Sequence, residues 1–391
     1  MTPRQKIDPK ANDLVRQAIA YSIRERDEVG VQVAAYLNGR LVIDTWDGIA
    51  DPATGRRVDG DTLFNVFSVT KAVTAVAVHI QAERGLIDYD APVARYWPEF
   101  GVKGKTTGTI RDALTHRLGV PFMPDGVTPE RMCDWDWMVK QFANMEPQFA
   151  QKSAYHAISQ GWILGEVVRR TDPKRRDFGT FVQEEICVPL AITDLWIGIP
   201  DEVEPRVATL IDYPSLPPYR QPGSPGYRSQ PSNVGTCAAV YGRGDVRRAC
   251  IAAAGGIFNA RSTARFFAML ANGGELDGVR LLSDACVRSF SEPRPNADEV
   301  DPVMMYVLQV GMGGLRVNDR PEKRMSTASV GTNPRIIYHP GAGGSIAWAD
   351  PDARLAVALC HNRMFDTYVS AEEDPFFPIG NAVRTALGIP N

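Results

Sequence analysis

The sequence has few of the residues that build metal centres and disulfide frameworks. Its 391 residues include only six cysteines and five histidines. The cysteines form no Cys-x-x-Cys pair, which argues against a thiolate zinc site and against a disulfide framework. The histidines form no His-Glu-x-x-His frame, the common metalloprotease motif. We therefore expect no metal in this protein.

Long apolar runs and a strong charge imbalance are also missing. No run approaches the roughly 20 apolar residues of a membrane-spanning helix, and residues Met1–Asp8 lack the apolar core of a secretory signal. The net charge of −3 and the isoelectric point near 6.0 give no electrostatic reason to expect nucleic acid or anionic lipid as a partner. We expect a cytoplasmic protein that binds neither nucleic acid nor membrane. The sequence does not indicate an oligomeric state.

Three glycine-containing motifs of other enzyme classes are absent as well. An α/β-hydrolase places its nucleophile in Gly-x-Ser-x-Gly, and the nearest stretch, Pro222–Gly226, departs from that motif at its first residue. The sequence contains no phosphate-binding Gly-x-x-x-x-Gly-Lys and no Gly-x-Gly-x-x-Gly after a predicted strand. We therefore expect a protein that works without a cofactor.

The chain is long enough for a large core, and its patterns change along its length. Residues 31–37 and 41–46 are β-rich and flank Asn38-Gly39, a strong hairpin signal. The middle of the chain is mostly helical, and β-rich runs return after residue 305. We predict an α/β (α+β) fold in which residues 1–85 and 245–391 form an antiparallel sheet flanked by helices. Residues 86–244 would form an inserted helical domain, with a Pro- and Gly-rich active-site loop at about 200–244.

Ser68 and Lys71 lie three residues apart where an extended segment runs into an apolar helix. On a helix this spacing places both side chains on one face. A serine hydroxyl needs an adjacent base to become a nucleophile, and a lysine can be that base only if burial lowers its pKa. Two simpler readings remain open at this point: the pair can arise by chance, and Ser68 can be an N-cap.

Two further clusters also fit a catalytic site. Tyr155 precedes an apolar helix, and its phenol could carry protons if a neighbouring lysine ammonium lowered its pKa. The run His339–Ser345 contains three glycines between predicted strands, which would free a backbone N–H to bind an oxyanion. A structural tyrosine and an ordinary hairpin turn are the alternatives.

Taken together and in this order, these motifs resemble those of the penicillin-recognising serine hydrolases, specifically their class C β-lactamase-like branch. The chain is most similar to the family VIII carboxylesterases within it. Residues Asp112–Pro121 and Ala254–Asn259 are also similar to the family, and the resemblance covers roughly residues 15–388.

The resemblance implies a role for each motif. Ser68 would be the acylated nucleophile, Lys71 and Tyr155 the acid/base pair, and the backbone N–H groups of Ser68 and Ala342 the oxyanion hole. The residues expected to contact the substrate are His339, Gly341, Phe122, Tyr227 and Trp348.

Two departures from the family pattern bear on the substrate. His339-Pro340-Gly341 stands where β-lactamases have Lys-Thr-Gly, which weakens the anchor for a substrate carboxylate. Ala157 replaces an asparagine two residues after the tyrosine. Both changes favour a serine carboxylesterase for small neutral esters, with short acyl chains. A β-lactamase, an amidase or an acyltransferase remains an alternative, as does a binding or sensor protein that is acylated without turnover.

Overall fold

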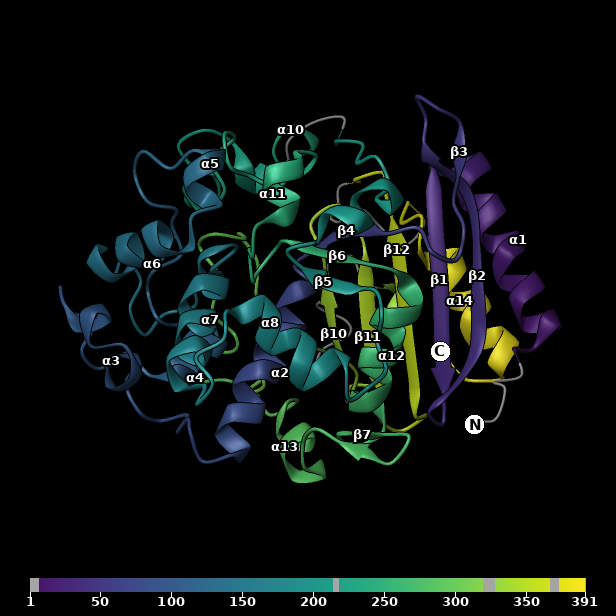
Figure 1. Ribbon diagram of the computed structural model, residues 1–391. Helices are drawn as coiled ribbons and strands as arrows, with labels where there is room; N and C mark the ends of the chain where they lie inside the picture. The colour runs from purple at the N-terminus through teal and green to yellow at the C-terminus, as the bar shows by residue number, and fades with distance from the viewer. Residues whose placement is uncertain (1–6, 214–217, 319–327, 366–372, 391) are drawn as a thin grey trace.

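The computed structural model describes residues 7–213, 218–318, 328–365 and 373–390. Its largest sheet has seven antiparallel strands in the order β3-β2-β1-β12-β11-β10-β9 (Figure 1). The first and last parts of the chain meet at its centre, where β1 pairs with β12 along seven residue pairs. This arrangement confirms the predicted antiparallel sheet built from both ends of the chain. The strands are β1 Gly30–Leu37, β2 Arg40–Asp51, β3 Arg56–Arg57, β9 Arg316–Val317, β10 Ile337–Pro340, β11 Ile346–Asp350 and β12 Leu355–His361.

The predicted hairpin turn lies between β1 and β2. Asn38 and Gly39 both have positive φ, at 50° and 75°. Two central residues with positive φ match the right-handed twist of the flanking strands, and asparagine followed by glycine is the pair that adopts this conformation most readily. The dipeptide therefore fixes where the chain turns back.

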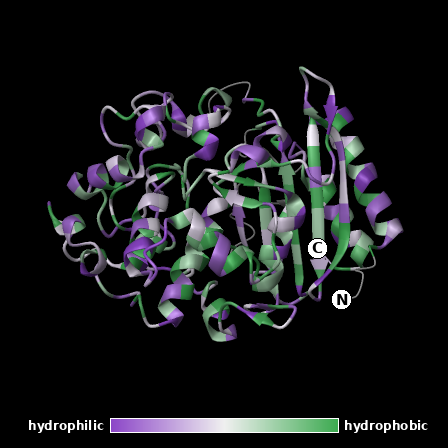
Figure 2. Ribbon diagram, in the orientation of Figure 1, coloured by the Kyte–Doolittle hydropathy of each residue, from purple (hydrophilic) through white to green (hydrophobic). Residues whose placement is uncertain are grey.

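Helices cover both faces of the large sheet. Helices α1 (Pro9–Glu25) and α14 (Phe377–Leu387) pack on one face, and α12 (Ala260–Ala271) packs on the other. Figure 1 shows α1 and α14 together at the right of the molecule. In Figure 2 the central strands are largely hydrophobic, whereas α1 alternates hydrophilic and hydrophobic segments, as expected for a helix with one buried face.

The middle of the chain is mainly helical and lies beside the sheet, at the left of Figure 1. This agrees with the mostly helical middle that the sequence predicted. The helices of this region are α2 Thr70–Glu83, α3 Val93–Tyr96, α4 Ile110–Leu114, α5 Pro129–Met132, α6 Trp135–Asn144, α7 Ser159–Thr171, α8 Phe178–Val182, α9 Pro225–Ser229, α10 Ala238–Tyr241 and α11 Gly244–Arg248. None of the helices in the described residues is both long and apolar enough to cross a bilayer.

A second, three-stranded sheet has the order β4-β6-β5, formed by Phe64–Phe67, Gly256–Phe258 and Leu195–Ile197. Strand β5 comes from the segment expected to be helical, and its partners come from the parts of the chain on either side of that segment. The strand expected at residues 305–310 is different: within the described residues only isolated bridges form there, at Val307 and Val310.

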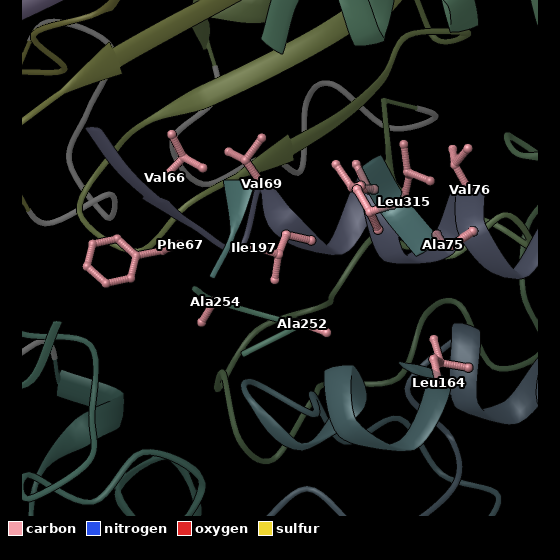
Figure 3. Close-up of a cluster of buried hydrophobic side chains, with 14 of the residues drawn as sticks. Val66, Phe67, Val69, Ala75, Val76, Leu164, Ile197, Ala252, Ala254 and Leu315 are labelled. Carbon is pink, nitrogen blue, oxygen red and sulfur yellow. The ribbon is translucent and has the colours of Figure 1, made fainter. Parts of the chain in front are cut away.

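Helix α2 is enclosed by apolar side chains from segments far apart in the sequence. All twelve residues from Thr70 to Gln81 are buried. Figure 3 shows side chains of β4, α2, β5, α7 and the segment 252–254 in this cluster. The start of α2 is therefore held within a well-packed buried core, which is a suitable support for a catalytic group.

Candidate active site

Ser68 follows a sharp bend at the end of β4. The register of β4 with β6 shifts between Asn65 and Phe67, and Phe67 has a φ of 45°. A positive φ is strained for a bulky residue and persists only where the surroundings impose it. The Phe67 ring is buried and packs edge-on against Tyr241 at 5.1 Å between centroids. This packing holds the bend, so that Ser68 stands between the strand and α2.

The N-cap alternative for Ser68 does not fit the structure. The N-cap position of α2 is Val69, and within the described residues no side chain caps this helix. The Ser68 hydroxyl instead lies near two other side chains, those of Lys71 and Tyr155. The structure thus brings together the three residues predicted to carry the chemistry.

Lys71 is buried and has three oxygen neighbours. Its Nζ lies 2.9 Å from Ser68 Oγ, 2.7 Å from the Ala157 carbonyl oxygen and 3.0 Å from the Ala253 carbonyl oxygen. Burial lowers the pKa of Lys71 well below its usual value, because the charged form loses its hydration. A neutral amine has two N–H donors and one lone pair. All three oxygens lie within hydrogen-bond distance of Nζ, so a neutral amine that donates to the two carbonyls would direct its lone pair to the Ser68 hydroxyl.

This contact also explains how the chain manages without the family's asparagine. The side chain at position 157 is a methyl group, but the backbone carbonyl of the same residue accepts a hydrogen bond from Lys71. Ala157 therefore orients the lysine through its main chain. Sequence reasoning missed this acceptor and also Ala253, because backbone acceptors leave no signal in the side-chain pattern.

Tyr155 is buried, and its hydroxyl donates to Ser68 Oγ over 3.3 Å. The Lys71 Nζ lies 5.2 Å from the centre of the tyrosine ring. Burial raises the pKa of Tyr155 to about 12. The expectation of a lowered phenol pKa is therefore wrong. It assumed a neighbouring ammonium, whereas loss of hydration on burial dominates the shift and disfavours the phenolate.

Two buried histidines support Tyr155. The His116 ring lies 4.6 Å from the tyrosine ring, and His116 Nδ1 accepts the backbone N–H of His156 over 3.1 Å. The His156 side chain contacts the Ala154 carbonyl through Nδ1 at 2.7 Å and accepts the Val120 N–H through Nε2 at 3.0 Å. Burial lowers the pKa of both histidines, that of His156 to about 4, so both rings are neutral. They were not predicted as site residues, although His116 lies in the motif Asp112–Pro121.

The glycine-rich turn after β10 lies against β4. A Cβ on Gly341 would overlap the Val66 carbonyl oxygen, so only glycine allows this close approach. Within the described residues, the backbone N–H groups of Ser68 and Ala342 donate to no backbone acceptor. These two groups are therefore available as donors to an oxygen atom of a bound molecule.

His339 lies at the inner edge of this turn but is buried. Its Nδ1 lies 2.9 Å from the Pro340 carbonyl oxygen. Burial lowers the pKa of His339 well below its usual value. The imidazole is therefore neutral, and it provides no positive charge for a substrate carboxylate.

Two of the aromatic residues predicted to contact the substrate, Phe122 and Tyr227, line a cavity of about 600 Å³ together with residues of the segments 122–127, 141–148 and 227–233. The described lining of this cavity does not include Ser68. The Arg228 guanidinium covers the Phe122 ring at 3.9 Å.

The prediction that Trp348 contacts the substrate is wrong. Trp348 is completely buried on the face of the sheet that packs on α1 and α14. Trp348 pairs with Tyr338 across β10 and β11, whereas His339 pairs with Ala347. Because side chains alternate between the two faces of a sheet, Trp348 points away from the face that His339 occupies. It belongs to the core and does not contact a substrate.

Among the residues that the structure describes, no group of three or more His, Cys, Asp or Glu side chains could hold a metal ion. The site has a hydroxyl, an amine with a strongly lowered pKa, a phenol and two backbone donors. This combination is suited to nucleophilic attack on a carbonyl followed by proton transfer.

The fold and this site define a class: the chain is a serine hydrolase with the β-lactamase fold. A family model described as Beta-lactamase matches residues 11–374, and the chain belongs to that family. It is 34% identical to the esterase/beta-lactamase LipL of Mycobacterium tuberculosis over 97% of this chain and 87% of that protein.

Solved structures are similar along nearly the whole chain. A family VIII carboxylesterase superposes with a TM-score of 0.86 at 29% identity, covering 98% of this chain and 99% of the other. A penicillin-binding protein homologue from Caulobacter crescentus superposes with a TM-score of 0.84 at 31% identity, covering 97% and 99%. The chain is thus an esterase/β-lactamase-fold hydrolase close to the family VIII carboxylesterases.

Proposed function

We propose that this protein is a serine carboxylesterase that hydrolyses small neutral esters with short acyl chains through an acyl-enzyme on Ser68. The observation that carries the proposal is the buried Lys71 amine, 2.9 Å from Ser68 Oγ, with a strongly lowered pKa. A buried amine is unfavourable for folding. Its position beside a serine hydroxyl is accounted for if it removes the proton of that hydroxyl.

In the acylation step, Ser68 Oγ forms a bond to the ester carbonyl carbon while its proton passes to Lys71 Nζ. The carbonyl oxygen becomes an oxyanion and accepts hydrogen bonds from the backbone N–H groups of Ser68 and Ala342. The bond from carbon to the alcohol oxygen then breaks. Tyr155 donates a proton to the departing alkoxide and regains one from Lys71, so the alcohol leaves neutral and the amine is neutral again.

Deacylation repeats these steps with water as the nucleophile. The Lys71–Tyr155 pair takes a proton from the water as its oxygen bonds to the acyl carbon. The bond to Ser68 Oγ then breaks and the serine regains a proton. The products are a carboxylic acid and the free enzyme, so no further reactant is required.

The turn after β10 supports a preference for neutral esters. Pro340 has no side-chain hydroxyl, and the neutral His339 offers no cation to a carboxylate. A substrate carboxylate would therefore lose its hydration without finding the Lys-Thr pair of the β-lactamases. The preference for short acyl chains rests on the family resemblance. The substrate positions of Gly341, Phe122 and Tyr227 and the cytoplasmic location remain predictions. The division of the chain into an α/β domain of residues 1–85 and 245–391 and a helical domain of residues 86–244 also remains a prediction.

A β-lactamase is the second candidate, because the relative from M. tuberculosis is named as both esterase and β-lactamase. Amidase, acyltransferase and non-turnover sensor activities share the first half of the mechanism. One panel separates them: kcat/KM for p-nitrophenyl acetate and butyrate, for the matching anilides, and for the chromogenic cephalosporin nitrocefin. We expect ester hydrolysis to exceed the other two reactions by at least 10²-fold. Nitrocefin turnover equal to ester turnover would contradict the proposal, and so would stoichiometric acylation without turnover.

A further inference from the structure

Ser68 and Tyr155 reach the site from different parts of the chain. Ser68 follows β4, whereas Tyr155 lies in an irregular stretch just before α7. Irregular backbone has no ladder of hydrogen bonds to fix it. Catalysis by a phenol nevertheless depends on its position, because a displacement of about 1 Å can cost up to 10²-fold in rate. Other contacts must therefore hold the Tyr155 segment in place.

One such contact lies two residues before the tyrosine, at Ser153. Arg294 Nη2 donates to Ser153 Oγ over 2.7 Å, and Ser153 Oγ donates to Asp301 Oδ2 over 2.9 Å. All three side chains are buried. Within the described residues Arg294 and Asp301 form no direct ion pair, so the serine hydroxyl joins the two charges. We call this unit the Arg294–Ser153–Asp301 bridge.

Each end of the bridge is anchored to the main chain. Arg294 also donates to the Thr115 carbonyl over 2.6 Å and to the Leu308 carbonyl over 2.9 Å. The Asp301 carboxylate accepts the backbone N–H groups of residues 303 and 304 over 2.9 and 3.1 Å. Hydrogen bonds to ionised groups are stronger than neutral ones. Ser153 is therefore fixed between a rigid charged donor and a rigid charged acceptor.

The same bridge reaches the ring on which Tyr155 packs. Thr115, one of the Arg294 acceptors, directly precedes His116, whose ring lies 4.6 Å from that of Tyr155. The Ala154 N–H donates to the His116 carbonyl over 3.0 Å. Arg294 thus ties together the segment that carries the tyrosine and the segment that supports its ring.

We propose that the Arg294–Ser153–Asp301 bridge positions the Tyr155 phenol over Ser68, with Ser153 as a positioning residue for proton transfer. The proposal rests on the esterase mechanism proposed above. A bridge that served only folding would change stability and leave the Tyr155-dependent step alone, so the two roles differ in what substitutions at Ser153 do to catalysis.

The first experiment compares Ser153→Ala with Ser153→Thr. The alanine removes both hydrogen bonds, whereas the threonine keeps a hydroxyl. We expect Ser153→Ala to lower kcat about 10-fold or more with KM within about twofold, and Ser153→Thr to recover most of the rate. Ser22→Ala is the matched control: Ser22 is a buried serine on α1 whose hydroxyl donates to the Pro375 carbonyl over 2.7 Å, and its loss should leave kcat unchanged.

The leaving group gives a second readout. An alkyl ester releases an alkoxide that needs the proton from Tyr155, whereas p-nitrophenolate departs as an anion. The loss of kcat/KM in Ser153→Ala should therefore be larger for ethyl acetate than for p-nitrophenyl acetate. An equal loss for both esters would overturn the proposal.

A mutant cycle with Tyr155→Phe completes the test. If Ser153 acts through the phenol, Ser153→Ala should cost about 10-fold in the wild type and less than about twofold in the Tyr155→Phe background. The same loss in both backgrounds rejects the bridge and leaves the proposed mechanism intact. A fully active Tyr155→Phe enzyme rejects the mechanism and the bridge together. Should Ser153→Ala fail to fold, Asp301→Asn, which keeps an acceptor oxygen, takes its place in the cycle.

Discussion

Burial shifts the pKa values of Lys71 and Tyr155 in opposite directions. The lysine pKa falls well below its usual value, which favours the neutral amine, and the phenol pKa rises to about 12, so the phenol stays protonated around pH 7. Two neighbouring groups with pKa values pushed apart are suited to serve as base and acid. In this arrangement the amine receives the serine proton and the phenol supplies a proton to the leaving group.

The pH dependence of the rate follows from these two directions. Protonation of Lys71 removes the base, so kcat/KM for a neutral ester should fall as the pH drops through the lowered lysine pKa. On the alkaline side the phenol stays protonated until the pH nears 12, so the rate should stay high to about pH 10. A pH–rate profile from 5 to 10 tests this. A decline that begins near pH 8 would contradict the assignment of a protonated Tyr155.

Tyr155→Phe keeps the ring that packs on His116 and removes only the hydroxyl. We expect kcat for an alkyl ester to fall on the order of 10²-fold or more, the usual effect of losing a general acid/base. Thermal unfolding should change little, because within the described residues the phenol oxygen has Ser68 as its hydrogen-bond partner. If this variant kept the wild-type kcat, Tyr155 would not be the group that protonates the leaving alcohol.

At the residue level, the sequence predicted which side chains lie together at the candidate site and missed their surroundings. The spacing of Ser68 and Lys71 and the apolar helix after them were visible in the chain. The acceptors of the lysine were not, because the Ala157 and Ala253 carbonyls are 86 and 182 residues away from it. The direction of the Tyr155 pKa shift depends on burial of the phenol by segments far away in the chain.

At the level of elements, α7 must lie close to the segment 252–254. A Cβ on Gly161 would overlap the Ala253 backbone nitrogen, and the same segment supplies a carbonyl to Lys71. Gly161→Ala should therefore push these elements apart, lowering the free energy of unfolding by about 1–3 kcal/mol and also reducing kcat. The control is Gly244→Ala in α11, where the new methyl group meets only the flexible end of Arg248. Denaturant unfolding and ester kinetics of both variants give the measurement, and equal stability of the two would contradict the packing argument.

The turn after β10 allows a second test of this kind. A methyl group on Gly341 would strike the Val66 carbonyl oxygen and displace the Ala342 N–H. Loss of an oxyanion donor typically costs 10²–10³ in kcat, so we expect a decrease of about that size in Gly341→Ala with a folded protein by circular dichroism. Full activity in this folded variant would remove Ala342 from the oxyanion hole.

The strands on either side of this turn show that the position of Trp348 could have been predicted from the sequence, because side chains alternate between the two faces of a sheet. Once His339 is assigned to the site, the alternation of side chains assigns its partner Ala347 to the same face and Trp348 to the other. The bend at Phe67 differs in this respect. Its positive φ is imposed by the β4–β6 bulge and by packing on Tyr241, and no local sequence signal indicates it.

For the whole molecule, the sequence predicted the class of fold because its two ends were β-rich and its middle helical. Seven strands from the ends form one sheet, as expected. The three-stranded sheet was not foreseen, since β4, β5 and β6 are short and lie far apart in the chain. Such pairings depend on long-range closure that local patterns do not encode. The pairing of β4 with β6 also holds the bend before Ser68. The three-stranded sheet, which was hardest to predict, therefore shapes the candidate active site.

The central claim is that one serine carries the acyl group during turnover. The most direct measurement is intact-mass spectrometry after millisecond-to-second mixing with p-nitrophenyl butyrate, followed by peptide mapping of the adduct. The account predicts one butyryl group per chain on the peptide that contains Ser68, and neither adduct nor hydrolysis in Ser68→Ala. An adduct on a different residue, or ester hydrolysis that persists in Ser68→Ala, would contradict it.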